Sequence, residues 1–243
     1  MRKRGIPALV CGLVAGAGGH AARAQELQLH YDWRHAVDPR TNPADFPALT
    51  FKTFKGFDFG SFLLKMEGDL NGTRHNLSKL YVEISQGLRF WKPAVYLHLE
   101  YTGGLGLFDG ATGGYYLDNA YLLGAAHPFP WQGSWGSVFL AYRYTNFQRP
   151  SRDPELSLYW GKTFHGRWSF ASTAVAWTAN RNHGDAATAQ LDGKRFSSLI
   201  ENEVWYQAVP HLSCGSLIRV SYNVFTADGR LLLYPTVGIR YSF

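Results

Sequence analysis

The sequence predicts an all-β protein: an antiparallel transmembrane β-barrel of about twelve strands, with ten strands as the alternative. Three observations indicate this fold. The final strand alternates between apolar and polar side chains and ends on an aromatic residue. Most of the preceding chain divides into short alternating segments separated by turn residues, and the first residues have the pattern of an export signal.

The last ten residues, 234–243, form the clearest strand. Successive side chains of a strand point to opposite faces, so one face carries Pro235, Val237, Ile239, Tyr241 and Phe243. The other carries Tyr234, Thr236, Gly238, Arg240 and Ser242. A final strand with one apolar face and a terminal Phe is common in outer-membrane barrels. We therefore expect it to contact outer-membrane lipid and the barrel-insertion machinery, which would place the protein in the bacterial outer membrane.

Residues 1–24 are predicted to be a cleaved signal peptide. Three basic residues, Arg2, Lys3 and Arg4, precede an apolar stretch at 6–18, and Ala22-Arg23-Ala24 offers a small-x-small cleavage pattern. The alternative is an N-terminal membrane anchor, but the apolar stretch is too short to span about 30 Å of hydrocarbon. The predicted mature chain, 25–243, would then form one barrel domain.

The charge of the predicted mature chain excludes one class of partner. The net charge of +6 includes four basic residues of the signal, and without them 20 basic residues face 18 acidic ones. A nucleic-acid partner therefore has no electrostatic support. Only Cys214 remains after processing, so no intramolecular disulfide is expected. Aromatic residues make up 16% of the chain, as the aromatic girdles of a barrel would require.

Twelve segments show the alternation of a half-buried strand. They are 26–33, 49–55, 61–70, 77–90, 94–102, 115–125, 137–147, 155–164, 168–179, 194–209, 216–226 and 234–243. The glycine-rich segment 103–114 is expected to be a loop, and Pro128 and Pro130 are expected to end the sixth strand region.

The connections between these segments alternate in length. An even number of strands puts both termini at the periplasmic end. The long connections 34–48, 103–114 and 180–193 would then lie outside the cell, and the short turns near 91–93 and 165–167 in the periplasm. This is the usual arrangement of bacterial barrels.

If the apolar faces contact lipid, the opposite faces line a lumen. Charges of both signs would pair there, either as structural supports or as parts of a solute-binding constriction, and Tyr81, Tyr96, Phe139 and Tyr234 could offer stacking faces for a flat solute. Arg240 is expected beside Arg219 of the neighbouring strand. The charged lumen candidates are Lys65, Glu67, Asp69, Glu83, Glu100, Arg143, Glu201, Glu203, Arg219 and Arg240.

Catalysis and cofactor binding have weak support. His211 and Ser213 could share a face, but they fall in a predicted turn beside Pro210 and no orienting partner is evident. His98 and Glu100 are better explained as a hydrogen-bonded lumen pair. The histidines lack metal-ligand spacing, and the glycines of 103–114 open no helix that could bind phosphate. We expect no enzyme activity, metal or cofactor.

Three stretches resemble the nucleoside-specific channel-forming proteins, the Tsx-like outer-membrane barrels, or a related uncharacterised branch. Residues 51–59, FKTFKGFDF, approximate the F-x-K-x-x-F-D-F hairpin of that family. Residues 237–243, VGIRYSF, are similar to its Phe-terminated last strand, and 27–32, LQLHYD, to the opening strand of the related branch. The resemblance implies a monomeric twelve-stranded barrel whose narrow lumen passes nucleosides by diffusion.

Four interpretations of the sequence therefore remain open. The first is a passive channel for small polar solutes, with nucleosides as the implied class. The second is a plugged barrel that acts structurally or as a receptor, and the third is a lipid-modifying barrel enzyme. The fourth is a soluble periplasmic β-sandwich.

Overall fold

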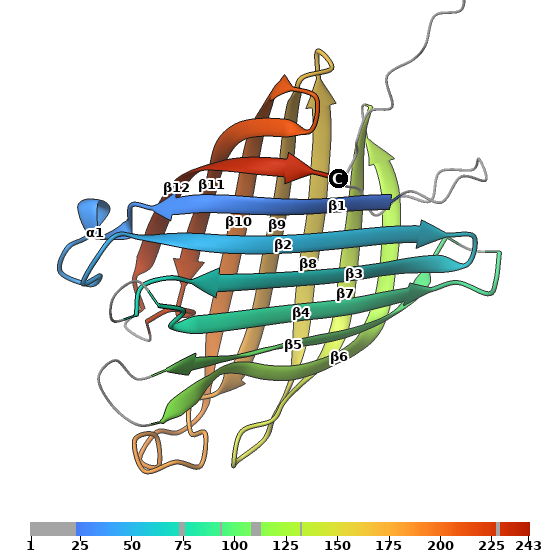
Figure 1. Ribbon diagram of the computed structural model, residues 1–243. Coiled ribbons are helices and arrows are strands. Elements are labelled where there is room, and N and C mark those ends of the chain that lie inside the picture. Colours follow the sequence, from blue (N-terminus) through green and yellow to red (C-terminus); the bar gives the residue numbers. More distant parts are fainter. Residues whose placement is uncertain (1–22, 73–75, 93, 108–112, 132, 227–228) are drawn as a thin grey trace, which may run out of the picture.

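The computed structural model describes residues 23–72, 76–92, 94–107, 113–131, 133–226 and 229–243. Within these ranges the chain forms a closed antiparallel barrel (Figure 1), in which every strand pairs with its neighbours in sequence and the first strand pairs with the last. The predicted fold class is confirmed. The signal predicted at 1–24 lies outside the described residues except for Arg23 and Ala24, which belong to the first strand.

The strands are β1 (Arg23–Asp32), β2 (Phe46–Phe57), β3 (Gly60–Asp69), β4 (Lys79–Leu88), β5 (Tyr96–Leu107), β6 (Gly114–Trp131), β7 (Ser134–Thr145), β8 (Ser151–Phe164), β9 (Trp168–Asn180), β10 (Lys194–Val209), β11 (Leu212–Tyr222) and β12 (Leu231–Ser242). One short helix, α1 (Arg34–Val37), follows β1. No helix in the described ranges is long and apolar enough to cross a membrane.

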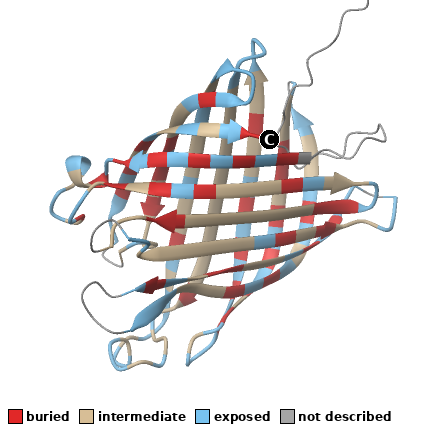
Figure 2. Cartoon of the chain, in the orientation of Figure 1, coloured by how far each residue is buried: buried red, intermediate tan, exposed pale blue. Residues whose placement is uncertain are grey.

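Alternation along each strand separates the two surfaces of the barrel. In β1 the side chains of Gln28 and His30 are buried, whereas Leu27 and Leu29 are 38% and 44% exposed. Figure 2 shows the same buried and exposed alternation along several strands. From Glu26 to Asp32 the exposed side chains of β1 are apolar and the buried ones polar, the reverse of a soluble domain. The outer surface thus suits lipid and the inner surface suits polar groups.

The glycine-rich segment predicted as a loop at 103–114 is strand at both of its ends, because β5 continues to Leu107 and β6 begins at Gly114. Two of its glycines make room for tyrosine rings. A Cβ atom on Gly106 would lie 2.3 Å from the ring of Tyr115, and one on Gly103 would lie 2.1 Å from the hydroxyl of Tyr101. Here glycine marks close packing inside a strand rather than a turn.

The prediction that Pro128 and Pro130 end the sixth strand region is also wrong, since β6 runs through both prolines to Trp131. Beyond Ala126, β6 pairs only with β7, because β5 begins at Tyr96, the partner of Ala126. This end of β6 therefore behaves as an edge, where a residue without an N–H is tolerated.

The strand predicted at 216–226 lies earlier, at Leu212–Tyr222. Two backbone positions set these limits. His211, with φ of 69°, closes the turn that precedes β11, and Asn223, with φ of 55°, follows its last residue. Ser213 is therefore part of a strand and not of a turn.

Both described ends of the chain lie at one end of the barrel, which we take as periplasmic. The turns at this end are short, and the β8–β9 turn has positive φ at both His165 and Gly166, the geometry of a tight type I′ hairpin. At the opposite end lie the connection that contains α1 and the 181–193 loop (Figure 1).

Candidate functional site

The interior surface of the barrel is the candidate site. The sequence-predicted side chains come to it from many strands: Lys65, Glu67 and Asp69 from β3, Tyr81 and Glu83 from β4, Tyr96 and Glu100 from β5, Arg143 from β7, Glu201 and Glu203 from β10, Arg219 from β11 and Arg240 from β12. Their contacts divide them into three groups.

The first group crosses the lumen. The Lys65 ammonium lies 2.8 Å from Glu201, and the Arg219 Nε atom donates to the other oxygen of Glu201 at 2.7 Å. A second Arg219 nitrogen donates to Glu67. In the ring of strands β3 and β10 are five places apart, so these contacts join nearly opposite walls. We call Lys65, Glu67, Glu201 and Arg219 the trans-lumen bridge.

The first group also includes contacts that lie beside the trans-lumen bridge, nearer the periplasmic end. Lys52 of β2 forms an ion pair with Glu203 of β10, which also accepts a hydrogen bond from the Trp205 indole at 2.9 Å. Arg240 lies 3.6 Å from Glu26, and its guanidinium lies 4.8 Å from the centre of the Trp205 ring. The side chains of Lys52 and Glu203 keep 15% and 13% exposure, so water reaches this region.

The prediction that Arg240 lies beside Arg219 is wrong. In the register of β11 and β12, Arg240 is opposite Ser213 and Arg219 is opposite Tyr234. The two guanidinium groups are held by different carboxylates, Glu26 for Arg240 and the pair Glu67 and Glu201 for Arg219. Separation along the strands removes the repulsion that adjacent arginines would experience.

Arg143 organises the second group, on the opposite side of the barrel. It lies 2.6 Å from Asp118, forms an ion pair with Glu155, and its guanidinium lies 5.1 Å from the centre of the Trp177 ring. Arg143 is only 4% exposed. Asp118 was missed in the sequence because β6 is the least regular segment, and Glu155 because it stood at the predicted start of its strand.

The third group contains carboxylates with few cationic partners. Glu100 lies 3.1 Å from His98, whose ring packs against Phe139. Glu83 is directly opposite Lys65 on the neighbouring strand, yet the Lys65 ammonium reaches across to Glu201 instead. Among the described residues Glu83 has no ion pair or hydrogen bond through its side chain. The wall formed by β4 and β5 therefore carries two carboxyl groups, Glu83 and Glu100, that have no Lys or Arg partner among the described residues.

Three of the four aromatic side chains proposed as stacking faces are already covered. Tyr234 packs against the guanidinium of Arg34 at 4.6 Å, Tyr96 lies 5.1 Å from the guanidinium of Arg89, and Phe139 is fully buried. Only Tyr81 keeps partial exposure, with the Lys65 ammonium 5.9 Å from its ring centre.

The outer end of the lumen has its own ion pairs. Arg34 binds Asp32 through two nitrogens, at 3.1 and 2.7 Å, and Asp69 lies 3.5 Å from the Lys79 ammonium. Arg34 was missed in the sequence because it falls in a predicted loop. The feature that could have indicated Arg34 is Asp32, an acidic residue two positions earlier on the inward face of β1.

Solvent exposure locates the open part of the interior. The inward side chains of β1, and those of β7 from Ser137 onward, are buried, whereas most of those on β3, β9 and β10 keep intermediate exposure. Lys65 and Glu201 themselves retain 12% and 15% side-chain exposure. Water therefore reaches the trans-lumen bridge.

The pair considered for catalysis is not assembled. His211 uses its Nδ1 atom in a 2.7 Å hydrogen bond with the carbonyl of Ser242. Ser213 is 4% exposed, and in the part of the chain that is described no hydrogen bond joins it to His211. The same described residues contain no group of three or more His, Cys, Asp or Glu side chains placed to hold a metal ion.

A family model described as a domain of unknown function, DUF5020, matches residues 24–243. The chain belongs to this family. No curated protein matches the DUF5020 chain. Membership of the nucleoside-specific channel family, which the sequence suggested, is not confirmed.

Two solved structures are similar to the chain, and the first of them shows the same fold. The NanC porin is 10% identical, with 90% of this chain and 99% of NanC covered and a TM-score of 0.53. A loop L8 deletion mutant of OmpT from Vibrio cholerae is 7% identical over 93% and 99% of the chains, with a TM-score of 0.46. The likeness to NanC shows that the DUF5020 chain shares the barrel fold of that porin, as the predicted fold class implies.

Proposed function

We propose that this protein is a passive channel through which small polar solutes diffuse across the outer membrane. The observation that carries the proposal is the set of charged, partly exposed side chains on the inward faces of β3 and β10. Charged groups at such positions favour a wetted lumen, because an empty or apolar interior would leave them without solvation. The porin-like fold supports the same function.

The charge distribution supports a preference for cations. The cations of the trans-lumen bridge are neutralised by Glu67 and Glu201, and Arg143 by Asp118 and Glu155. Glu83 and Glu100 have no Lys or Arg within ion-pair distance in the described structure. Rings or walls of carboxylates raise the local concentration of cations in a pore.

Within the class of small polar solutes we propose nucleosides as the solute to be examined first. A nucleoside combines a flat base with hydroxyl and amino donors. Tyr81 offers a partly exposed ring, and Glu83, two residues along the same face of β4, offers carboxylate acceptors. Stacking and hydrogen bonding would therefore meet at one place on the wall.

Single-channel recording tests this proposal. Purified protein in a planar bilayer should give unitary currents, and added nucleosides should reduce them in a concentration-dependent way. Glu83→Gln should weaken this block, whereas Asp58→Asn, a matched loss of charge at an exposed periplasmic turn, should not. Unitary currents that do not change when nucleosides are added would contradict the nucleoside proposal but would still support a channel.

A closed structural or receptor barrel is the second candidate, and the trans-lumen bridge is the observation that favours it. Ion pairs that join β3 to β10 narrow the lumen. The absence of any unitary current from correctly folded protein would establish this candidate in place of the channel. The proposal contains no enzymatic step, and a phospholipase assay of the purified protein checks that point.

A further inference from the structure

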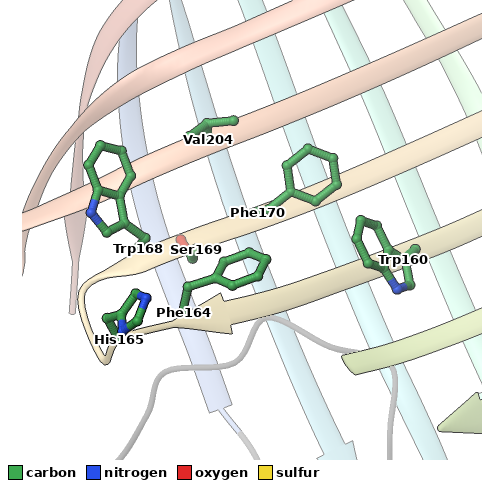
Figure 3. A pocket seen from close by; sticks show the side chains of 7 residues that line it. All are labelled: Trp160, Phe164, His165, Trp168, Ser169, Phe170 and Val204. Carbon is green, nitrogen blue, oxygen red and sulfur yellow. The ribbon is translucent and has the colours of Figure 1, made fainter. Parts of the chain in front are cut away.

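The outer surface of the barrel carries a pocket near its periplasmic end. Side chains of β8, β9 and β10 line a groove of about 500 Å³ that is open on the outer surface (Figure 3). Its volume falls in the range of about 300–1,000 Å³ that is typical of small-ligand pockets. The apolar lining consists of Trp160, Phe164, Trp168, Phe170 and Val204, with His165 at the turn.

The pocket faces the membrane and not the lumen. Trp177 of β9 and Trp205 of β10 contact interior groups, so Phe170 and Val204, an odd number of residues away on the same strands, point outward. Trp168, Phe164 and Val204 are 46%, 39% and 37% exposed. The walls are fixed by ring contacts, with Trp160 and Phe170 centroids 5.0 Å apart.

Cationic side chains surround the periplasmic edge of this pocket. The Lys162 ammonium lies 5.4 Å from the centre of the Phe164 ring. Arg167 donates to the hydroxyl of Tyr206 at 3.3 Å, and the Tyr206 ring packs against Trp168 at 4.9 Å. The sequence contains no acidic residue from 156 to 184 or from 204 to 227. Glu203, next to Val204, points inward and forms an ion pair with Lys52, so the charged side chains that face outward at this edge, Lys162 and Arg167, are cationic.

We propose that this pocket binds an anionic phospholipid of the inner leaflet, independently of the channel function. One acyl chain fills the apolar groove, and the phosphate lies between Lys162 and Arg167. Only an amphiphile with an apolar body and a negative head matches both parts of the site. The position at the periplasmic end selects the leaflet, because phospholipid headgroups lie there at the level of the aromatic belt.

The charge of the lipid is tested by direct binding. The protein is reconstituted in vesicles of phosphatidylethanolamine that contain a minor fraction of phosphatidylglycerol, extracted in mild detergent and examined by native mass spectrometry. One phosphatidylglycerol should remain bound per chain. The double variant Lys162→Gln, Arg167→Gln should reduce its affinity by roughly 30-fold, as expected for two basic groups near an anionic surface.

Two further variants distinguish lipid binding in the pocket from general attraction to surface charge. Lys55→Gln, Lys92→Gln removes the same charge from exposed positions elsewhere on the periplasmic rim and should leave binding unchanged. Val204→Trp fills the groove with both cations intact and should abolish binding. Equal retention of phosphatidylethanolamine, equal loss in the control variant, or capture of a protein instead of a lipid would each overturn the proposal.

Discussion

The Lys65 ammonium lies 2.8 Å from a carboxylate oxygen of Glu201 on the far wall, although Lys65 is directly opposite Glu83 on the adjacent strand. This choice of partner has two effects. It joins nearly opposite walls of the barrel, and it leaves the carboxylate of Glu83 facing the lumen without an ion pair. Because Lys65 binds Glu201, the carboxyl group of Glu83 is available to bind a solute.

Lys65→Ala should widen the conducting path. The substitution removes the ammonium and the stem that cross between β3 and β10, so single-channel conductance should rise. Glu201 keeps Arg219 as a partner, and we expect the free energy of unfolding to fall by about 1–3 kcal/mol. Lys55→Ala, on an exposed rim position, is the control. An unchanged conductance would show that the bridge does not limit the current.

Glu83→Gln and Glu100→Gln should each lower the preference for cations over anions. Both substitutions keep the size of the side chain and replace a carboxyl group on the wall formed by β4 and β5 with a neutral amide. The measurement is the reversal potential across a salt gradient, where the double variant should shift furthest toward zero. A reversal potential equal to that of the unmodified protein in both single variants would contradict the assignment of selectivity to this wall.

Arg143→Ala should destabilise the barrel strongly. Arg143 is 4% exposed and contacts both Asp118 and Glu155, so its removal leaves two carboxylates without their cation. Loss of one partner of a buried ion pair costs about 3–5 kcal/mol. Urea unfolding in detergent, followed by heat-modifiable gel migration, measures the change. Arg143→Lys should recover part of the stability, and full stability of the alanine variant would refute this role.

Acidification should loosen the 181–193 loop. Burial lowers the pKa of His183, with a further contribution from Arg195, while Asp185 acts in the opposite direction. The His183 ring stacks on Phe147 at 3.9 Å. The folded loop favours the neutral imidazole of His183. The stabilisation of the loop by this side chain is therefore complete above the usual His pKa of about 6.5 and is lost as the pH falls below that value.

Hydrogen exchange of the 181–193 segment, corrected for the intrinsic pH dependence, checks this expectation. Exchange should increase on acidification in the unmodified protein. In His183→Gln it should be insensitive to pH over the same range. An equal pH response in both proteins would assign the effect to another group.

The strand plan could be predicted from the sequence because alternation reports which face of each strand meets lipid. The same alternation located Lys65, Glu83 and Glu201 on inward faces. The register could not be predicted, since alternation is unchanged by a shift of two residues. The expected neighbours Arg219 and Arg240 were for that reason placed together, although each arginine has its own carboxylates.

Composition misled where tertiary packing decided the structure. Gly103 and Gly106 suggested a loop, but both lie in a strand, where the missing side chain leaves space for the rings of Tyr101 and Tyr115. Pro128 and Pro130 suggested a break, but one side of β6 has no partner there and needs no N–H donor. Asp118 was not predicted because β6 is the least regular segment, and Arg34 was not predicted because it falls in a predicted loop.

The interior contacts also bear on the order in which the barrel assembles. Lys65 and Glu201 are 136 residues apart in the chain, Lys52 and Glu203 are 151 apart, and Glu67 and Arg219 are 152 apart. Each pair joins an early strand to a late one, so none can form until β10 and β11 have been added. We therefore expect the trans-lumen contacts to form late, together with ring closure, whereas the ion pairs of Arg143 need only β6, β7 and β8.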